Sequence, residues 1–176
     1  EKLEADENSD SWLQHVDDYR TITKLRVMRR HQQLIRLDFE DGFDQVNTDA
    51  LIKDYRLALQ ATNVVVLSDY GKGTLHDVAR FIELAVDQDK PVLVDPKGTD
   101  FSIYRQATLM TPNLGEFETV VGRCTDQQQL VERGMNLLDE LALSGLLITK
   151  GEQGMTLLSQ HHEPLHLPTQ DRKSVV

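Results

Sequence analysis

Apolar and polar side chains alternate strictly in two stretches near the start of the chain, residues 21–29 and 33–39, which a short polar link at residues 30–32 separates. The apolar positions are Leu25, Val27, Ile35, Leu37 and Phe39. Successive side chains of a strand point to opposite faces, so this pattern predicts an antiparallel hairpin with one apolar face. The opposite face is mostly basic and carries Lys24, Arg26 and Arg36.

From residue 48 the spacing of apolar positions changes to that of helices alternating with short buried strands. Thr48 is placed to cap a helix, and residues 63–67 form a continuous β-branched run typical of a buried parallel strand. Residues 74–77 resemble the capped start of a second helix. The expected core stripe of the first helix is Leu51, Ile52, Tyr55 and Leu59, and that of the second is Val78, Phe81, Ile82, Ala85 and Val86.

The same rhythm continues to the end of the chain. We expect strands at residues 91–94, 108–110 and 146–149, with one more around Met155 and Leu157, and helices from about residues 114 and 126. Residues 125–128 have the pattern of a capping box for the second of these helices. Strands that alternate with helices predict an α/β fold, with a mostly parallel sheet and helices on its faces. The hairpin does not fit this rhythm and is expected to be a small accessory sheet.

Polar, glycine-bearing segments follow four successive predicted strands. In open α/β sheets, ligands bind beyond the carboxyl ends of the strands. Three of the segments contain a lysine, namely Lys72, Lys97 and Lys150. The four segments are residues 68–73, 95–98, 111–116 and 149–154. A scaffold alone does not require this concentration of polar residues at one edge, so the edge is the first place to look for a binding site.

Each of these segments also has a purely structural interpretation. Asn113 and Glu116 have the spacing of a capping box, yet an amide oxygen and a carboxylate on one helical turn also suit a metal-bound water beside a phosphate. Lys97 lies in a Pro-Gly turn, or supplies positive charge to a transferring phosphoryl group. Residues 149–154 form a plain turn, or let a nucleotide approach bare backbone. The Lys72 segment lacks P-loop spacing.

The cationic face of the hairpin is likewise open to two interpretations. Lys24, Arg26 and Arg36 form either a solvated surface or an anion site for a substrate that already carries a phosphate. His161, His162 and Cys124 have no partners at metal-ligand spacing, so we interpret them as structural or surface residues.

Composition narrows the class of protein. The 176 residues are 39% apolar and 27% charged, as in globular domains, and the net charge of −10 argues against nucleic-acid binding. A single cysteine excludes an internal disulfide and fits a reducing compartment. No apolar run is long enough to span a bilayer, and residues 1–6 lack the pattern of a signal peptide. We therefore expect a cytoplasmic protein that binds neither membrane nor nucleic acid.

Taken together, residues 64–75, 91–105, 107–118 and 146–158 resemble consecutive core segments of the ribokinase-like carbohydrate kinases. The hairpin and residues 164–170 resemble the branch that forms the kinase half of bacterial bifunctional proteins of ADP-heptose synthesis. That resemblance runs from about Thr21 to Gln170. It implies ATP- and Mg²⁺-dependent phosphorylation of D-glycero-β-D-manno-heptose 7-phosphate at O1, for the lipopolysaccharide core, by a homodimeric enzyme.

The resemblance also implies roles for individual residues. Glu116 would order Mg²⁺ through water, and Lys97 would lie near the phosphates as a stabiliser. The hairpin would be a lid or dimer sheet over the sugar, with Lys24, Arg26 and Arg36 on the substrate. The residues expected at the nucleotide are Asn113, Leu114, Gly115, Glu116, Thr149, Lys150 and Gly151.

The chain also departs from the family. Its 176 residues contain neither the family's glycine-rich sugar-binding segment nor the Gly-Ala-Gly-Asp motif, whose aspartate is the catalytic base. No catalytic base is therefore assigned, and we expect this chain alone to be inactive. The expected units are a frayed or partial segment at 1–20, a lid-like hairpin at 21–39, an incomplete kinase core at 40–170, and a tail unlike the family at 171–176.

Two other functions remain open at this point. One is a kinase for another sugar or sugar phosphate. The other is a non-catalytic module that binds nucleotide or dimerises through the hairpin.

Overall fold

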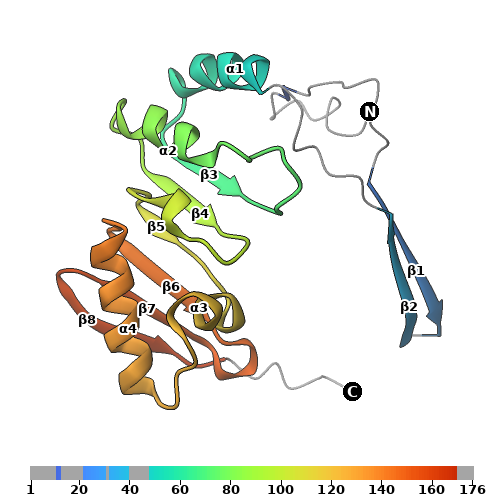
Figure 1. Cartoon of the computed structure of the whole chain (residues 1–176), viewed down its shortest axis with the longest axis vertical. Coiled ribbons are helices and arrows are strands. Elements are labelled where there is room, and N and C mark those ends of the chain that lie inside the picture. Colours follow the sequence, from blue (N-terminus) through green and yellow to red (C-terminus); the bar gives the residue numbers. More distant parts are fainter. Residues whose placement is uncertain (1–10, 13–21, 31, 40–47, 170–176) are drawn as a thin grey trace.

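The computed structural model describes residues 11–12, 22–30, 32–39 and 48–169, which form a two-stranded and a six-stranded sheet (Figure 1). Nearly all of the segment predicted at 1–20 and the whole tail at 171–176 lie outside the described residues. The same holds for Thr21, His31, residues 40–47 and Gln170. Among the described residues, no helix combines the length and the apolar character needed to cross a membrane.

The small sheet is the predicted hairpin. Strand β1 (Thr23–Arg29) pairs with β2 (Gln32–Phe39) in antiparallel register, with Leu25 opposite Leu37 and Val27 opposite Ile35. The alternation therefore places the apolar side chains on one face, as predicted. Every residue of both strands is exposed.

The large sheet has its strands in chain order, β3-β4-β5-β6-β7-β8. Strands β3 to β6 are parallel, and β7 and β8 are antiparallel additions at one edge. The bounds of the strands are Val65–Ser68 (β3), Val92–Asp95 (β4), Leu109–Met110 (β5), Gly145–Thr149 (β6), Met155–Ser159 (β7) and His162–Leu167 (β8). The sheet is thus mixed but mostly parallel. Of its strands, β8 was not predicted from the apolar pattern.

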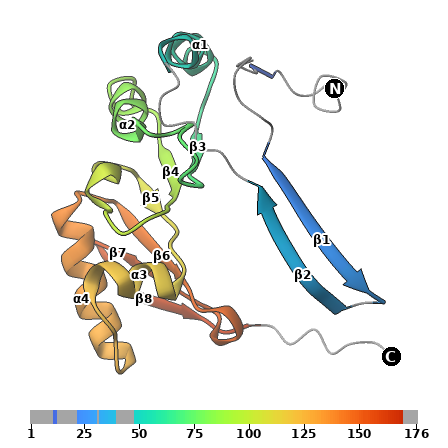
Figure 2. The ribbon, with the colours of Figure 1, turned by 45° about the vertical axis from the view of Figure 1, so that its right-hand side comes forward.

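The helices are α1 (Asp49–Leu59), α2 (Val78–Val86), α3 (Leu114–Val121) and α4 (Gln127–Glu140), with short 3₁₀ turns η1 (Ser102–Tyr104) and η2 (Gly151–Gln153). Helices α2 and α4 pack on the same face of the sheet (Figure 2). Right-handed crossovers between strands added always in the same direction put every connecting helix on one face. The predicted fold, a mostly parallel sheet with flanking helices and a small antiparallel hairpin, is therefore confirmed, and within the described residues α2 and α4 share one face of the sheet.

The burial of the strands follows from this one-sided cover. The core lies between the helices and the inner row of the sheet, which includes Val94, Met110, Leu146 and Leu158, all completely buried. On the other face, Val66 and Leu165 are 66% and 49% exposed. That face is apolar, and within the described residues no helix covers it.

The helix ends agree with the sequence only in part. Asn113 and Glu116 form the predicted capping box of α3. The N-cap of α4 is Asp126, whose side chain accepts from the Gln129 N–H, so the N-cap lies one residue after Thr125, the position predicted by the box at 125–128. Thr48 is the N-cap residue of α1 but makes no side-chain cap bond. The predicted stripe of α2 is buried except for Val86, its last residue, which is 37% exposed.

Candidate functional site

The segments that follow β3, β4, β5 and β6 are joined along one edge of the large sheet. The Asp69 N–H donates to the Asp95 carbonyl at 3.0 Å, and the Thr111 N–H donates to the Val94 carbonyl at 2.9 Å. The Thr149 N–H donates to the Pro112 carbonyl at 3.0 Å, and Asn113 and Thr149 form a further parallel bridge. All four polar segments therefore lie at the carboxyl edge that the sequence pointed to, which we call the rim.

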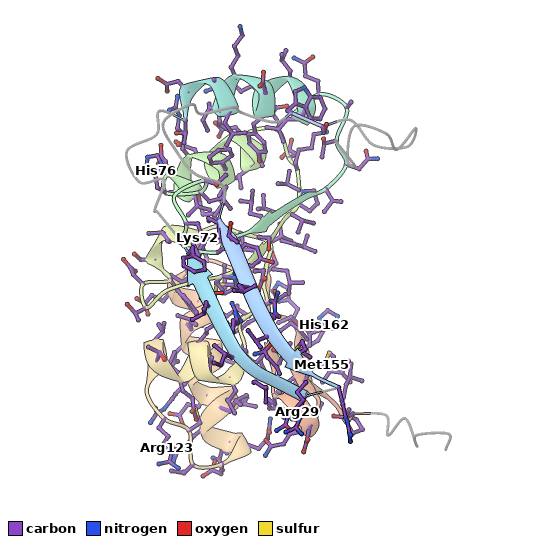
Figure 3. All side chains as sticks on the ribbon, turned by 90° about the vertical axis from the view of Figure 1, so that its right-hand side faces the viewer. Arg29, Lys72, His76, Arg123, Met155 and His162 are labelled. Carbon is purple, nitrogen blue, oxygen red and sulfur yellow. The ribbon has the colours of Figure 1, made fainter. Side chains whose placement is uncertain are left out.

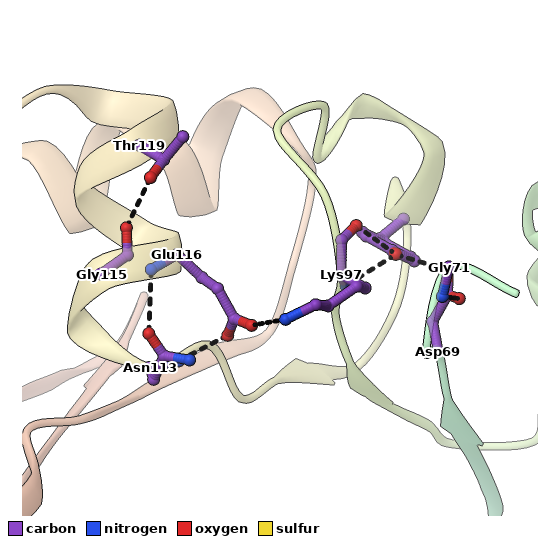
Figure 4. A network of polar contacts seen from close by, with 8 residues as sticks. Asp69, Gly71, Lys97, Asn113, Gly115, Glu116 and Thr119 are labelled. Atoms are coloured by element: carbon purple, nitrogen blue, oxygen red, sulfur yellow. Dashed lines mark hydrogen bonds and ion pairs between the residues drawn. The ribbon is translucent and has the colours of Figure 1, made fainter. Parts of the chain in front are cut away.

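The centre of the rim is an ion pair between Lys97 and Glu116 (Figure 4). The Lys97 Nζ lies 2.9 Å from Glu116 Oε1, while Glu116 Oε2 accepts the Asn113 N–H at 3.1 Å. The Asn113 side chain in turn accepts the Glu116 N–H at 2.9 Å. The hydrogen bond that the Lys97 ammonium donates to Glu116 raises the pKa of Lys97 above its usual value, so the ammonium stays charged. Glu116 thus serves as a helix cap and as the partner of a cation at the same time.

The first turn of α3 presents the remaining predicted residues of this segment. Leu114 is the first residue of α3 and packs against the core. A side chain at Gly115 would come within 3.3 Å of the Asn113 amide oxygen, and the Gly115 carbonyl accepts from the Thr119 hydroxyl at 2.7 Å (Figure 4). A glycine here leaves the backbone at the helix N-terminus accessible, and such a terminus attracts negative charge.

The loop after β6 lies beside Asn113 and is held at several points. The Lys150 N–H donates to the Gly154 carbonyl at 2.8 Å, and its ammonium donates to the Gln127 side chain at 3.3 Å. Gly151 has a φ of 57°, and no atom lies within 4 Å of where its Cβ would be. The Thr169 hydroxyl donates to the Glu152 carbonyl at 2.6 Å, which fixes the far side of this loop. The backbone of Gly151 is therefore both positioned and open.

The hairpin lies in front of the large sheet in Figure 3, with Lys72 close to it. Lys24 of the hairpin lines a cavity of about 530 Å³ together with Ser68, Asp69, Tyr70 and Lys72. Lys24, Arg26 and Arg36 share one face of the hairpin, and Arg26 lies opposite Arg36. Arg36 forms an ion pair with Asp38 at 2.9 Å on that face. The face is therefore less purely cationic than the sequence pattern indicated. Its apolar counterpart points the opposite way.

Three residues that make contacts in this region were not identified as site residues from the sequence. Asp69 and Tyr104 join the loop after β3 to the loop that carries Lys97. Gln127, at the start of α4, holds Lys150. Asp69 was inside a segment already singled out, but Tyr104 follows no strand end and Gln127 looks like an ordinary first-turn residue. Only the fold brings these residues to the rim.

The donors at the rim suit a magnesium ion that keeps most of its water. Within the part of the chain that the structure describes, no three His, Cys, Asp or Glu side chains come together so as to hold a metal ion directly. Mg²⁺ is commonly held by one or two carboxylates together with waters and phosphate oxygens. The Glu116 carboxylate, 17% exposed beside a helix N-terminus, fits such an outer role.

Comparison with known proteins identifies relatives along nearly the whole chain. Residues 5–176 match the family described as pfkB family carbohydrate kinase. A "Bifunctional protein HldE" of Nitrosococcus oceani is 56% identical over 161 residues, which cover 92% of this chain and 34% of that protein. The protein of the same name from Histophilus somni is 50% identical over 158 residues, 90% of this chain and 33% of its own length. This chain thus spans about a third of these relatives.

Solved structures agree on the fold. Phosphofructokinase-2 from Escherichia coli, in its tetrameric inhibited form, matches with a TM-score of 0.60 at 17% identity, covering 76% of this chain and 46% of that one. Arabidopsis thaliana ribokinase, complexed with ribose and ATP, matches with a TM-score of 0.60 at 14% identity, covering 79% and 45%. At these identities the likeness establishes a ribokinase-like fold, as expected from the sequence.

Proposed function

Because this chain belongs to the pfkB family of carbohydrate kinases, we propose that it forms part of a kinase that transfers the γ-phosphoryl group of ATP to O1 of D-glycero-β-D-manno-heptose 7-phosphate. Relatives at 50–56% identity carry the name HldE, which supports this narrower substrate within the family. The product would be a 1,7-bisphosphate on the route to ADP-heptose and the lipopolysaccharide core. A cytoplasmic location suits ATP as the phosphoryl donor.

The Lys97–Glu116 ion pair at the rim is the observation that carries this proposal. Phosphoryl transfer needs positioning and electrostatic stabilisation more than covalent chemistry, and a fixed cation at the end of a parallel strand supplies both. Lys97 would stabilise the charge of the transferring group. The nucleotide would lie over the neighbouring backbone of Asn113, Leu114, Gly115, Glu116, Thr149, Lys150 and Gly151.

Glu116 would hold a water of the magnesium ion that accompanies ATP. When bound, Mg²⁺ neutralises charge on the phosphate oxygens. Both Glu116 oxygens are already engaged, one by Lys97 and one by the Asn113 N–H. The oxygen that accepts the Asn113 N–H would therefore keep this bond, while the other oxygen would contact the magnesium-bound water in place of Lys97 or together with it.

The sugar phosphate would occupy the cavity between the hairpin and the loop after β3. Lys24 and Lys72 both line it, and Asp69 and Ser68 offer oxygen atoms suited to sugar hydroxyls. Arg26 and Arg36 extend the cationic face beyond Lys24 and would contact the 7-phosphate. A substrate that carries a phosphate would pair with the positive charges of this face, whereas an unphosphorylated sugar would not.

A full-length protein that carries this sequence is the right material for the test. ADP release would be followed with the heptose 7-phosphate and with a panel of other sugar phosphates. We expect turnover with the heptose phosphate and a large loss of kcat in Lys97→Met, because the fixed positive charge is removed. Preference for a different sugar phosphate would refute the proposed substrate, and full activity of Lys97→Met would refute the role of Lys97.

The 176-residue polypeptide on its own is proposed to be inactive, because none of its aspartates occurs in a Gly-Ala-Gly-Asp motif. Turnover by this polypeptide close to that of the full-length protein would contradict this.

A second function, dimerisation, is favoured by the hairpin. The exposed apolar face includes Val27, Ile35 and Leu37, which are 41%, 53% and 44% exposed, and two isolated strands are marginal in water. A second copy that covers this face would make a homodimer. A module that only dimerises or binds nucleotide predicts association without ADP release, so sedimentation combined with the assay separates the two functions.

A further inference from the structure

Tyr104 is completely buried, yet its hydroxyl lies between two loops of the rim. It is 2.7 Å from Asp69 Oδ2, and 3.0 Å from both the N–H and the carbonyl of Lys97. A hydroxyl has one proton to donate, and the shorter contact to a carboxylate is the stronger one. Tyr104 therefore donates to Asp69 and accepts the Lys97 N–H.

The Asp69 carboxylate is itself oriented before it meets Tyr104. Its Oδ1 accepts the Gly71 N–H at 2.7 Å, and Gly71 adopts a φ of 62° that a glycine reaches without strain. Burial raises the pKa of Tyr104, so its hydroxyl remains protonated and able to donate. Asp69 also lines the cavity beside the hairpin. A continuous polar connection thus runs from that cavity through Asp69 and Tyr104 to Lys97 and Glu116.

Lys97 needs such an anchor because little else restrains it. Its side chain is 54% exposed, and the chain around it is a turn in which Gly98 has a φ of 93° and open space beside it. In the part of the chain that the structure describes, the Tyr104 hydroxyl accepts the backbone N–H of Lys97, and Glu116 holds its ammonium. A lysine side chain has four rotatable bonds, so its reach depends on where its backbone is held.

We propose that Tyr104 is a positioning residue whose hydroxyl fixes the backbone of Lys97 and so keeps the Lys97 ammonium against Glu116. The contact is a property of the described residues, whereas its consequence for phosphoryl transfer rests on the function proposed above. Tyr104 touches no substrate and acts only through Lys97 and Asp69.

The direct test follows the Lys97 ammonium in the 176-residue chain by NMR, with ¹³C at the lysine Cε carbons. In Tyr104→Phe the ring and its packing remain and the hydroxyl is lost. We expect the pKa of Lys97 to fall toward that of an ordinary lysine, because the Lys97 backbone is no longer fixed and its ammonium is no longer held beside Glu116 and Asp95, the acidic groups that raise this pKa. An unchanged Lys97 titration in a folded Tyr104→Phe protein would overturn the proposal.

Tyr55→Phe is the matched control. The Tyr55 hydroxyl donates to the Phe81 carbonyl at 3.0 Å, so this variant also removes a partly buried tyrosine hydroxyl, but one that does not contact Lys97. Its Lys97 titration should equal that of the wild type. If Tyr104→Phe does not fold, Asp69→Asn provides the test instead. This variant leaves Tyr104 in place and weakens only the acceptor that orients the Tyr104 hydroxyl. It should lower the Lys97 pKa by a smaller amount, and no change would overturn the proposal.

A second measurement separates this proposal from the proposed function. In a full-length protein that carries this sequence, Tyr104→Phe should lower kcat for ADP release by up to about 100-fold, with a much smaller change in KM for ATP. Its effect should largely vanish in a Lys97→Met background, since the two residues act as a unit. If the Lys97 titration shifts while ADP release does not change, the positioning contact stands and the role of Lys97 in the kinase is what fails.

Discussion

The hairpin and the large sheet are both specified by apolar patterning, but only the sheet encloses its apolar side chains. In the hairpin, Leu25 opposite Leu37 and Val27 opposite Ile35 form a regular face that is open along its whole length. In the sheet, the equivalent row of Val94, Met110 and Leu146 is completely buried beneath the helices. The same period-two pattern therefore fixes which side chains share a face, but not whether anything covers that face.

This difference bears on where each region draws its stability and its function. The rim is built on strands whose inner face is packed, so its hydrogen bonds start from a rigid base. The hairpin adds cations from a pair of strands with no core of their own, and its position depends on contacts made elsewhere. We expect chemistry that requires fixed distances to reside at the rim, and recognition that tolerates movement to use the hairpin.

The largest loss of stability should come from truncating a side chain in the core between the large sheet and its helices. Phe117, on α3, is completely buried, so Phe117→Ala should lower the free energy of unfolding by about 3–5 kcal/mol because it leaves a cavity. The measurement is urea unfolding followed by circular dichroism. A loss below about 1 kcal/mol would mean that the core beneath α3 is not close-packed, and would remove the contrast with the hairpin.

The next largest effect should come from the loop that follows β6. Gly154 has a φ of 82°, and a Cβ there would collide with the Leu167 carbonyl and lie 2.9 Å from backbone atoms of Pro168. Gly154→Ala should therefore cost about 2–3 kcal/mol, from the strained φ and the collision together.

Gly98→Ala is the matched control for this loop. Gly98 also has a positive φ, 93°, but nothing lies within 4 Å of its Cβ position, so only the strain of about 1 kcal/mol applies. Urea midpoints of the two variants compare them directly. Equal losses would show that the packing of Gly154 against β8 is absent in solution, and that this part of the rim is as open as the hairpin.

Much of the architecture could be predicted from the sequence because it depends on local patterns. Short apolar runs followed by polar residues predicted β3, β4 and β6, and the Asn113–Glu116 spacing predicted the capping box of α3. Strand β8 could not be predicted, since His162, Glu163 and Pro164 interrupt the alternation and its pairing depends on β7 alone. The one-sided helix cover could not be predicted either, because apolar spacing does not reveal the order of strands in the sheet.

The candidate site divides in the same way. The polar segments were visible at the strand ends, and the general rule for parallel sheets was enough to group them. Which side chains meet was not visible, because those contacts join distant positions: Lys97 to Glu116 across 19 residues and Asp69 to Tyr104 across 35. Tyr104 carried no signal of its own, since a buried aromatic residue is ordinary in a core.

A smaller effect, and one that depends on pH, is expected at the cap of α4. Asp126 accepts the Gln129 N–H, which lowers the pKa of the Asp126 carboxyl below its usual range. A lowered pKa in the folded state stabilises the fold above the ordinary carboxyl pKa near 4, and that contribution is lost as the pH falls through the folded value. Asp126→Ala should lower Tm by about 2–4 °C at pH 7.

The difference in Tm between Asp126→Ala and the wild type should shrink as the pH falls below about 4. Thermal melts at pH 7 and at successively lower pH values test this. A difference that stays constant would show that the cap does not depend on the charge of Asp126. Asp126→Asn is the control, because it keeps a capping oxygen and removes the titration.

The smallest change in the free energy of unfolding should come from a substitution in the hairpin. How stability depends on protein concentration then shows whether a second copy covers the hairpin. Leu37 is 44% exposed, so Leu37→Ser in a monomer gives up far less burial than the loss of a core side chain and should change the free energy of unfolding by less than about 0.5 kcal/mol. If a second copy covers the apolar face, as proposed, Leu37→Ser will instead weaken self-association in sedimentation measurements. Stability would then rise with protein concentration in the wild type and much less in the variant.

Lys53→Ser, an exposed change on α1 away from the hairpin strands, is the control and should leave association unchanged. Sedimentation as a monomer in the wild type and both variants would refute the covered face, leaving the hairpin as an exposed pair of strands beside a packed sheet.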